Sequence, residues 1–230
     1  MCKIILIETS TSLCSVSLAI DGKIASNRES STPKAQASLT APFVKDVLGE
    51  NGLLAKDCDA VCVSAGPGSY TGLRVGVSTA KGLCFAAGIP LLSVGTLDVL
   101  ASQATGSGML PEGCRYIIPL IDARRMEVYT ATYSPDGKRL TEVEPVVVTP
   151  DSFQKELAEG PVLFIGDGAA KCTSVICSPN ARFLQTCPHA SAMLKPAMRE
   201  MAAKNFQDTA YFEPFYLKQF VATVSKKKLF

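Results

Sequence analysis

A glycine-rich turn between an apolar segment and a helix is the part of the sequence best suited to bind a ligand. Residues 59–65 are predicted to form a short buried strand, and Gly66-Pro67-Gly68-Ser69-Tyr70-Thr71-Gly72 follows directly. Glycine lets the backbone approach a ligand closely, and the N–H groups at the start of the following helix carry partial positive charge. A structural turn and an anion site fit this pattern equally well. The anion site would comprise Gly66, Gly68, Ser69 and Thr71, and either hydroxyl could cap the helix.

Two common phosphate-binding consensus sequences do not fit this turn. A Walker A loop would continue with Gly-Lys-Ser/Thr, and a dinucleotide-binding turn would have its third glycine where Thr71 stands. The turn therefore does not identify a nucleotide by itself. Thr9 and Ser10, which follow a strand predicted at 3–8, could complete the anion site, and Glu8 ends that strand.

The helix predicted at 70–87 carries a stripe of small residues. Gly72, Gly76 and Ala80 are four positions apart, and Leu83 extends the stripe. Residues with this spacing share one face of a helix, so another helix could approach the backbone closely there.

A second stripe lies on a helix predicted at about 34–50, where Leu39, Phe43 and Val47 recur every four residues. The two helices could pack on each other within one chain or form an interface with another subunit. Apolar residues away from both stripes favour an intermolecular contact; these are Val44, Leu48, Val75 and Phe85. The predicted partner interface consists of Leu39, Phe43, Val47, Gly72, Gly76, Ala80 and Leu83.

The two halves of the chain show similar orders of predicted elements. Three strands within residues 3–28 form an antiparallel meander, and strand–helix–strand alternation follows. The second half begins with a predicted strand pair, at 116–121 and 127–133, so both halves run strand pair, helix, strand, helix. Its first helix is capped by Thr149, and its last helix, at 190–204, contains Pro196. The order predicts a mixed α/β fold and hints at a duplication, with a boundary at the Gly/Ser-rich segment 106–108.

The composition is that of a compact soluble protein. Of the 230 residues, 47% are apolar and 19% are charged, and no apolar run reaches the ~20 residues of a membrane span. These features predict a cytoplasmic location and no membrane association. The nine cysteines are odd in number and form no Cys-x-x-Cys pair, so free thiols are expected. A net charge of +2 argues against a free-standing tRNA-binding module.

The turn and the following helix resemble the signature of the TsaB family, whose older name is YeaZ. The matching residues run from 66 to 76 and continue through Ala80-Lys81-Gly82-Leu83. The opening Ile5-Leu6-Ile7-Glu8-Thr9-Ser10 is similar to the family's start, although Glu8 stands where the family usually has aspartate. Further matching segments are 89–91, 122–124, 127–129 and 213–217. The resemblance spans essentially the whole chain.

The resemblance implies the fold of actin, hexokinase and Hsp70, which is a ribonuclease-H-like α/β fold. Two related lobes would each contain a mixed five-stranded sheet. The N-terminal lobe would span residues 1–105 and be completed by the segment at about 208–230. The C-terminal lobe would span residues 106–207.

The resemblance also implies partners. Family members bind the related transferase TsaD, which adds threonylcarbamoyl to the tRNA adenosine beside the anticodon, and the ATPase TsaE joins the pair. By resemblance, this chain is expected to be a non-catalytic scaffold that forms a heterodimer with a TsaD-like transferase and meets tRNA only indirectly. A homodimer is possible in isolation. No cofactor is expected for the chain by itself, although ADP or ATP could bind in the complex.

The chain lacks the metal ligands of the transferase. By resemblance, TsaD holds its catalytic metal with two histidines four positions apart on a helix, and the matching positions here are Thr96 and Leu100. Leucine cannot bind a metal, and threonine is a poor ligand. His189, the single histidine, is expected at the surface or at a helix cap. We therefore expect no metal site and no catalytic residue, which argues against a metallopeptidase.

A catalytically active, nucleotide-dependent enzyme of the same superfamily, such as a small kinase, is the alternative. Glu8, Thr9 and the 66–72 turn would then contact phosphate, and Asp122 would be the candidate base in the second half. The short chain and the lack of a recognisable second phosphate-binding hairpin argue against this alternative.

Overall fold

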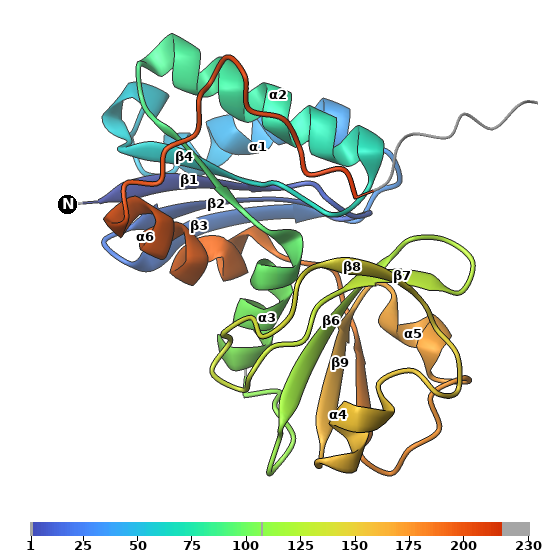
Figure 1. The fold of residues 1–230 in the computed structure, drawn as a ribbon. Helices are drawn as coiled ribbons and strands as arrows, with labels where there is room; N and C mark the ends of the chain where they lie inside the picture. The colour runs from blue at the N-terminus through green and yellow to red at the C-terminus, as the bar shows by residue number, and fades with distance from the viewer. Residues whose placement is uncertain (1, 107, 218–230) are drawn as a thin grey trace, which may run out of the picture.

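Two five-stranded mixed sheets form the framework of the protein (Figure 1). The computed structural model describes residues 2–106 and 108–217. In the first sheet the strand order is β3-β2-β1-β4-β5. The first three strands are antiparallel, and β4 and β5 continue parallel to β1. The strands are β1 (Lys3–Glu8), β2 (Cys14–Ile20), β3 (Lys23–Ser30), β4 (Ala60–Ser64) and β5 (Leu91–Val94).

The second sheet repeats this topology. Its order is β8-β7-β6-β9-β10, again with three antiparallel strands followed by two parallel ones. The strands are β6 (Tyr116–Asp122), β7 (Glu127–Thr130), β8 (Glu144–Val147), β9 (Val162–Gly166) and β10 (Ala181–Gln185). Identical topology in both halves confirms the predicted duplication and the predicted actin/hexokinase/Hsp70-like, ribonuclease-H-like fold.

Helices cover both faces of the first sheet because its central strands are apolar on both sides. Residues 4–8 of β1 are completely buried. The helices α1 (Gln36–Gly49) and α2 (Tyr70–Ala87) pack on one face. The short helix η2 (Ala190–Met193) and α6 (Leu194–Ala202) pack on the other, as the layers above and below the sheet in Figure 1 show. A 3-10 turn, η1 (Ala55–Asp57), precedes β4.

The second sheet is also enclosed between helices. The helix α3 (Thr96–Gly106) packs on one face through Leu97, Leu100 and Ala104. The short helices α4 (Gln154–Ala158) and α5 (Ala169–Cys172) cover the other face around Phe164. Each lobe therefore has its own three-layered core.

Some helices pack on the sheet of the lobe to which chain order does not assign them. The helix α3 precedes the expected boundary at 105/106 but packs on the second sheet, whereas η2 and α6 precede the expected end at 207 but pack on the first. Residues 207–217, here called the C-terminal strap, run back along α2 (Figure 1). Within the strap, Gln207 N–H donates to the Leu91 carbonyl, and Phe215 N–H donates to the Ala65 carbonyl. Packing thus places the lobe boundaries differently from chain order.

Three local predictions are corrected by the structure. Thr149 does not cap a helix, because its N–H donates to Ser152 Oγ in a turn and α4 begins only at Gln154, after Phe153 in the left-handed region. The exposed four-residue strand β8 was not predicted. Pro196 does not interrupt a helix, since it lies in the first turn of α6, where the backbone N–H needs no partner within the helix.

The cysteines are free thiols, as predicted. All nine lie in the described residues and are unpaired. Burial raises the pKa of Cys58 and of Cys84 to about 11. Among the described residues, no helix is long and apolar enough to cross a bilayer.

Candidate functional site

The turn after β1 packs directly against the N-terminal end of α2. The Thr9 hydroxyl donates to the Gly72 carbonyl at 2.8 Å, and Ser69 N–H donates to the Ser10 carbonyl at 2.6 Å. A Cβ atom on Gly68 would overlap Ser10, and one on Gly72 would overlap the Thr9 carbonyl. These glycines are therefore required for the close approach of two backbone segments.

The small-residue stripe of α2 faces the interior of its own lobe. A Cβ atom at Gly76 would overlap Thr9 Oγ1 and press on Val63, and Ala80, one turn further along α2, is fully buried. Val47 of α1 is also fully buried. The interface predicted for Gly72, Gly76, Ala80 and Val47 is therefore wrong, because these residues already pack against the sheet and the first turn. The Val44 and Leu48 side chains, expected on the surface, are likewise buried.

The predicted helix cap is at Ser69, whose Oγ accepts the Gly72 N–H at 3.3 Å. Thr71 is exposed in the first turn. Gly66 is buried at φ +108°, where the strap carbonyl of Phe215 and the Leu73 side chain fill the space of a Cβ atom. The turn thus supports the strap and the Thr9–Ser10 turn, with Ser69 and Thr71 as its exposed part.

Glu8 ends β1 inside the molecule. Its Oε1 accepts hydrogen bonds from Ser10 N–H at 2.6 Å and from Ser64 Oγ at 3.0 Å. Burial raises the pKa of Glu8 from 4.5 to about 7; hydrogen bonds from Ser10 and Ser64 lower it in part, and the charge of Asp167 raises it further. A buried acid cannot attract a phosphate, so Glu8, Thr9 and Ser10 would reach a nucleotide only after a rearrangement. All three are completely buried.

A second acidic group stands at the corresponding place of the second sheet. Asp122 ends β6 as Glu8 ends β1, and Asp167 follows β9. Asp167 Oδ1 accepts the Asp122 N–H at 2.9 Å, and Lys171 pairs with the Asp122 carboxylate. Burial raises the pKa of Asp167 from 3.8 to about 6. Asp167 was not predicted; the duplication alone could have indicated it, because Gly-Asp-Gly occupies the place of the 66–68 turn.

Four buried side-chain oxygens have no hydrogen-bond partner among the residues that the structure describes. They are Glu8 Oε2, Ser10 Oγ, Thr11 Oγ1 and Thr96 Oγ1. Thr96 N–H donates to the Gly66 carbonyl at 2.9 Å, which places the start of α3 beside the turn. An unpaired buried oxygen is costly, so this junction is suited to a buried water or a protonated carboxyl group.

The outer side of α2 carries a different ridge from the one predicted. Val75, Thr79, Gly82 and Ala86 follow one another at intervals of four, three and four residues, and all are half-buried or exposed. A Cβ atom on Gly82 would meet no atom within 4 Å. Leu83 of α2 and Leu39 and Phe43 of α1 are half-buried, and Phe43 and Leu83 pack against the same core cluster. The ridge is the face of α2 on which a second helix could pack closely.

The strap and α2 enclose a groove of about 370 Å³. The Arg74 guanidinium lies 4.1 Å from the centre of the Tyr70 ring, and its Nε donates to Tyr216 Oη at 3.3 Å. Lys81 Nζ donates to two strap carbonyls, those of Ala210 and Phe212, at 3.0 and 3.2 Å. These cations hold the strap in place, and Phe85, one turn further along α2, is 86% exposed.

The two positions that the resemblance matches to metal ligands carry Thr96 and Leu100, a poor ligand and a side chain that binds no metal. Thr96 begins α3, and Leu100 lies one turn later in the core of the second lobe. His189 lies on another segment, at the start of η2, where its ring is paired with Glu29 rather than exposed alone. Within the described residues, no three His, Cys, Asp or Glu side chains are grouped as metal ligands would be.

Comparison with known proteins places this fold and this motif in one family. A family model described as "TsaD: tRNA N6-adenosine threonylcarbamoyltransferase" matches residues 30–225. The tRNA threonylcarbamoyladenosine biosynthesis protein TsaB of Escherichia coli K12 is 30% identical over 230 residues, which cover 96% of each chain.

Two solved structures from Pseudomonas aeruginosa match the whole architecture. One, described as an uncharacterized protein with similarity to peptidase YEAZ, gives a TM-score of 0.83 at 27% identity and covers 95% of this chain and all of that one. The other, YeaZ, gives a TM-score of 0.78 at 26% identity and covers 94% and 100%. Because the end-to-end matches are TsaB and YeaZ, the chain belongs to the TsaB (YeaZ) family.

Proposed function

We propose that the chain is a non-catalytic partner of a TsaD-type threonylcarbamoyltransferase and serves the formation of threonylcarbamoyladenosine in tRNA. The observation that carries the proposal is the pair Thr96 and Leu100, which by resemblance stand where the transferase has its metal ligands. Leucine binds no metal and threonine is a poor ligand, which supports a chain that does not itself perform the transfer step. The biosynthetic role in the names of its TsaB relatives supports the pathway.

The partner would bind on the ridge of α2 and the neighbouring surface of α1. Gly82 lets a second helix approach the α2 backbone, and Leu39, Phe43 and Leu83 supply apolar surface at its side. A TsaD-type protein of the same fold would present a matching pair of helices. In the absence of that partner, a second copy of the chain could use the same ridge to form a homodimer.

Other components would join through the complex. A TsaE-type ATPase would bind the pair, and tRNA would contact the assembly mainly through the transferase, in keeping with a net charge of only +2. ADP or ATP would bind in the complex, with Ser69 and Thr71 as the exposed residues of the predicted anion site.

Reconstitution tests the proposal. The purified chain is mixed with its cognate TsaD-type and TsaE-type proteins, the adenylate-forming enzyme and unmodified tRNA, and modified adenosine is measured. We expect modification only when the chain and the transferase are both present. Equal modification without the chain would contradict the scaffold role, and modification by the chain without the transferase would show that it is itself catalytic.

The acidic cluster at the lobe junction is the observation that favours the alternative, an active nucleotide-dependent enzyme. Asp122, Asp167 and Lys171 together resemble a set of groups that could move a proton. If the isolated chain hydrolysed ATP, and if Asp122→Asn abolished this hydrolysis without changing the melting temperature, the enzyme alternative would replace the scaffold proposal.

A further inference from the structure

The chain crosses from the second lobe back to the first at residues 186–190. Thr186 N–H still donates to the Gly166 carbonyl at the end of β9. Four residues later, Ala190 is fully buried against the first sheet. The short crossing must therefore keep a fixed path if the lobes are to keep their relative position.

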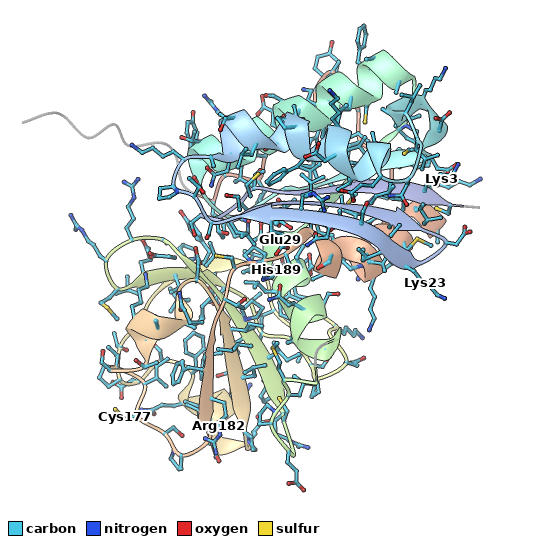
Figure 2. The ribbon with its side chains drawn as sticks, turned by 180° about the vertical axis from the view of Figure 1, so that it is seen from behind. Lys3, Lys23, Glu29, Cys177, Arg182 and His189 are labelled. Atoms are coloured by element: carbon cyan, nitrogen blue, oxygen red, sulfur yellow. The ribbon has the colours of Figure 1, made fainter. Side chains whose placement is uncertain are left out.

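An ion pair holds one side of the crossing to the first sheet. His189 Nδ1 lies 2.8 Å from Glu29 Oε1, and Ser15 Oγ donates to the same oxygen at 2.8 Å. Ser15 Oγ also accepts the Ala190 N–H at 2.9 Å. Figure 2 shows Glu29 and His189 side by side where the two lobes meet.

A glutamine holds the other side of the crossing to α3, which packs on the second sheet. Gln103 Oε1 accepts the His189 N–H at 3.2 Å. Its Nε2 donates to Thr186 Oγ1 at 3.1 Å and to the Cys187 carbonyl at 3.3 Å. The crossing is thus fixed between β2 and β3 on one side and α3 on the other.

The ion pair depends on a proton. Acidic groups act on His189 from two strands, Glu29 on β3 and Glu8 on β1, and α3 contributes the uncharged Gln103. The hydrogen bond to Glu29 raises the pKa of His189 above 6.5, and the same bond lowers the pKa of Glu29 below 4.5. The side chains of His189 and Glu29 are 33% and 27% exposed, so water screens the pair only in part.

We propose that His189 and Glu29 form a proton-controlled latch that fixes the crossing between the lobes while the imidazole is charged and loosens it when the imidazole loses its proton. A neutral ring can still donate Nδ1–H to Glu29, so the latch weakens without vanishing. Because the folded pKa of His189 is raised, its stabilisation of the folded protein is complete below pH 6.5 and is lost as the pH rises through that folded pKa. Because the folded pKa of Glu29 is lowered, its stabilisation of the folded protein is present above pH 4.5 and is lost only in stronger acid.

The single histidine makes the first test direct. A proton NMR titration of the imidazole follows one residue only. We expect a midpoint above that of the urea-unfolded chain and a return toward the unfolded midpoint in Glu29→Gln, which keeps the shape of the side chain. Glu50→Gln is the control, because Glu50 pairs with Arg28 and not with His189. An unchanged midpoint in Glu29→Gln would overturn the ion pair.

Amide hydrogen exchange tests the latch itself. Protection of the His189 and Ala190 amides is compared below and above the measured midpoint, after correction for the intrinsic pH dependence of exchange. We expect a loss of about fivefold in the wild type, the equivalent of ~1 kcal/mol, and a much smaller loss in Glu29→Gln. Equal protection at both pH values would show that the crossing is fixed without the proton. The test uses the isolated chain, so it does not depend on the proposed partner.

Discussion

The Thr9 hydroxyl occupies the space that any side chain at Gly76 would need. It donates to the Gly72 carbonyl, one turn earlier on α2, and a Cβ atom at Gly76 would overlap it. The turn after β1 therefore packs against the α2 backbone at the places where Gly72 and Gly76 have no side chain. The glycines explain the depth at which α2 lies on the sheet, and they leave the outer ridge for other contacts.

Replacing Gly76 should destabilise the fold. Gly76→Ala places a methyl group against Thr9 Oγ1 and Val63 in a fully packed region, which should lower the free energy of unfolding by about 1–3 kcal/mol. Denaturant unfolding measures the change. Gly82→Ala, on the same helix but open to solvent, should be neutral or stabilising by up to ~1 kcal/mol. Equal effects at the two positions would contradict the inward orientation of Gly76.

Replacing Gly82 with a large residue should separate folding from partner binding. Gly82→Leu adds a side chain where the chain itself has no neighbour, so the melting temperature should hold, but a partner helix could no longer approach the ridge. Size-exclusion chromatography with the cognate TsaD-type protein should show loss of the complex. Gly106→Leu, which also meets no atom but lies on α3, is the control and should bind normally. Normal binding by Gly82→Leu would exclude the ridge as the interface.

The sequence was sufficient for elements whose apolar pattern is long. The helix predicted at 70–87 is observed at Tyr70–Ala87, and the strands of the first meander were placed within a residue or two. The orientation of α2 could not be predicted in the same way. Two ridges of small residues lie on this helix, and the position of Thr9, more than sixty residues earlier in the chain, decides which one is buried.

Short and polar elements were not predicted because their local sequence carries little or misleading information. The strand β8 has four residues and lies mostly in solvent, so it lacks an alternating pattern. Thr149-Pro150 has the local chemistry of a helix start, but the bond from Thr149 N–H to Ser152 Oγ closes a turn instead. Asp167 became visible only when both sheets could be aligned by topology.

The stability of the protein should fall as the pH rises toward 7. A folded pKa of about 7 for Glu8, against 4.5 unfolded, means that the folded state binds more protons between these values. Ionising the buried Glu8 therefore lowers the stability of the folded protein by as much as ~3 kcal/mol, and this full loss is reached only above pH 7. Glu8→Gln should remove the part of this pH dependence that Glu8 contributes, leave the part that comes from Asp167, and be more stable than the wild type at pH 8. Lower stability of Glu8→Gln at pH 8 would mean that the charged carboxylate is stabilised by a bound group.

The purified chain should contain no stoichiometric zinc or iron. Leu100 is part of the apolar core, and Thr96 offers only a neutral hydroxyl, so the α3 positions supply no ligand set. Elemental analysis after dialysis against a mild chelator tests this expectation. About one equivalent of metal per chain would require a site formed by other residues.

Nucleotide should bind the isolated chain weakly, if at all, and more tightly in the complex. Glu8, Thr9 and Ser10 are buried, and the carbonyl of Ser10 already accepts the first N–H of the turn at Ser69. Of the predicted anion site, Ser69 and Thr71 are exposed and Gly68 is half-buried, so without a rearrangement the chain offers few of the donors that phosphates need. Calorimetry with ADP should therefore give no measurable heat for the isolated chain and a clear signal for the mixture with its transferase.

Ser69→Ala is not a suitable probe, because it also removes the helix cap. Thr71→Ala leaves the cap intact and should weaken ADP binding in the complex alone. Sub-micromolar binding by the isolated chain would mean that the turn opens without a partner, and it would favour the nucleotide-dependent enzyme over the scaffold.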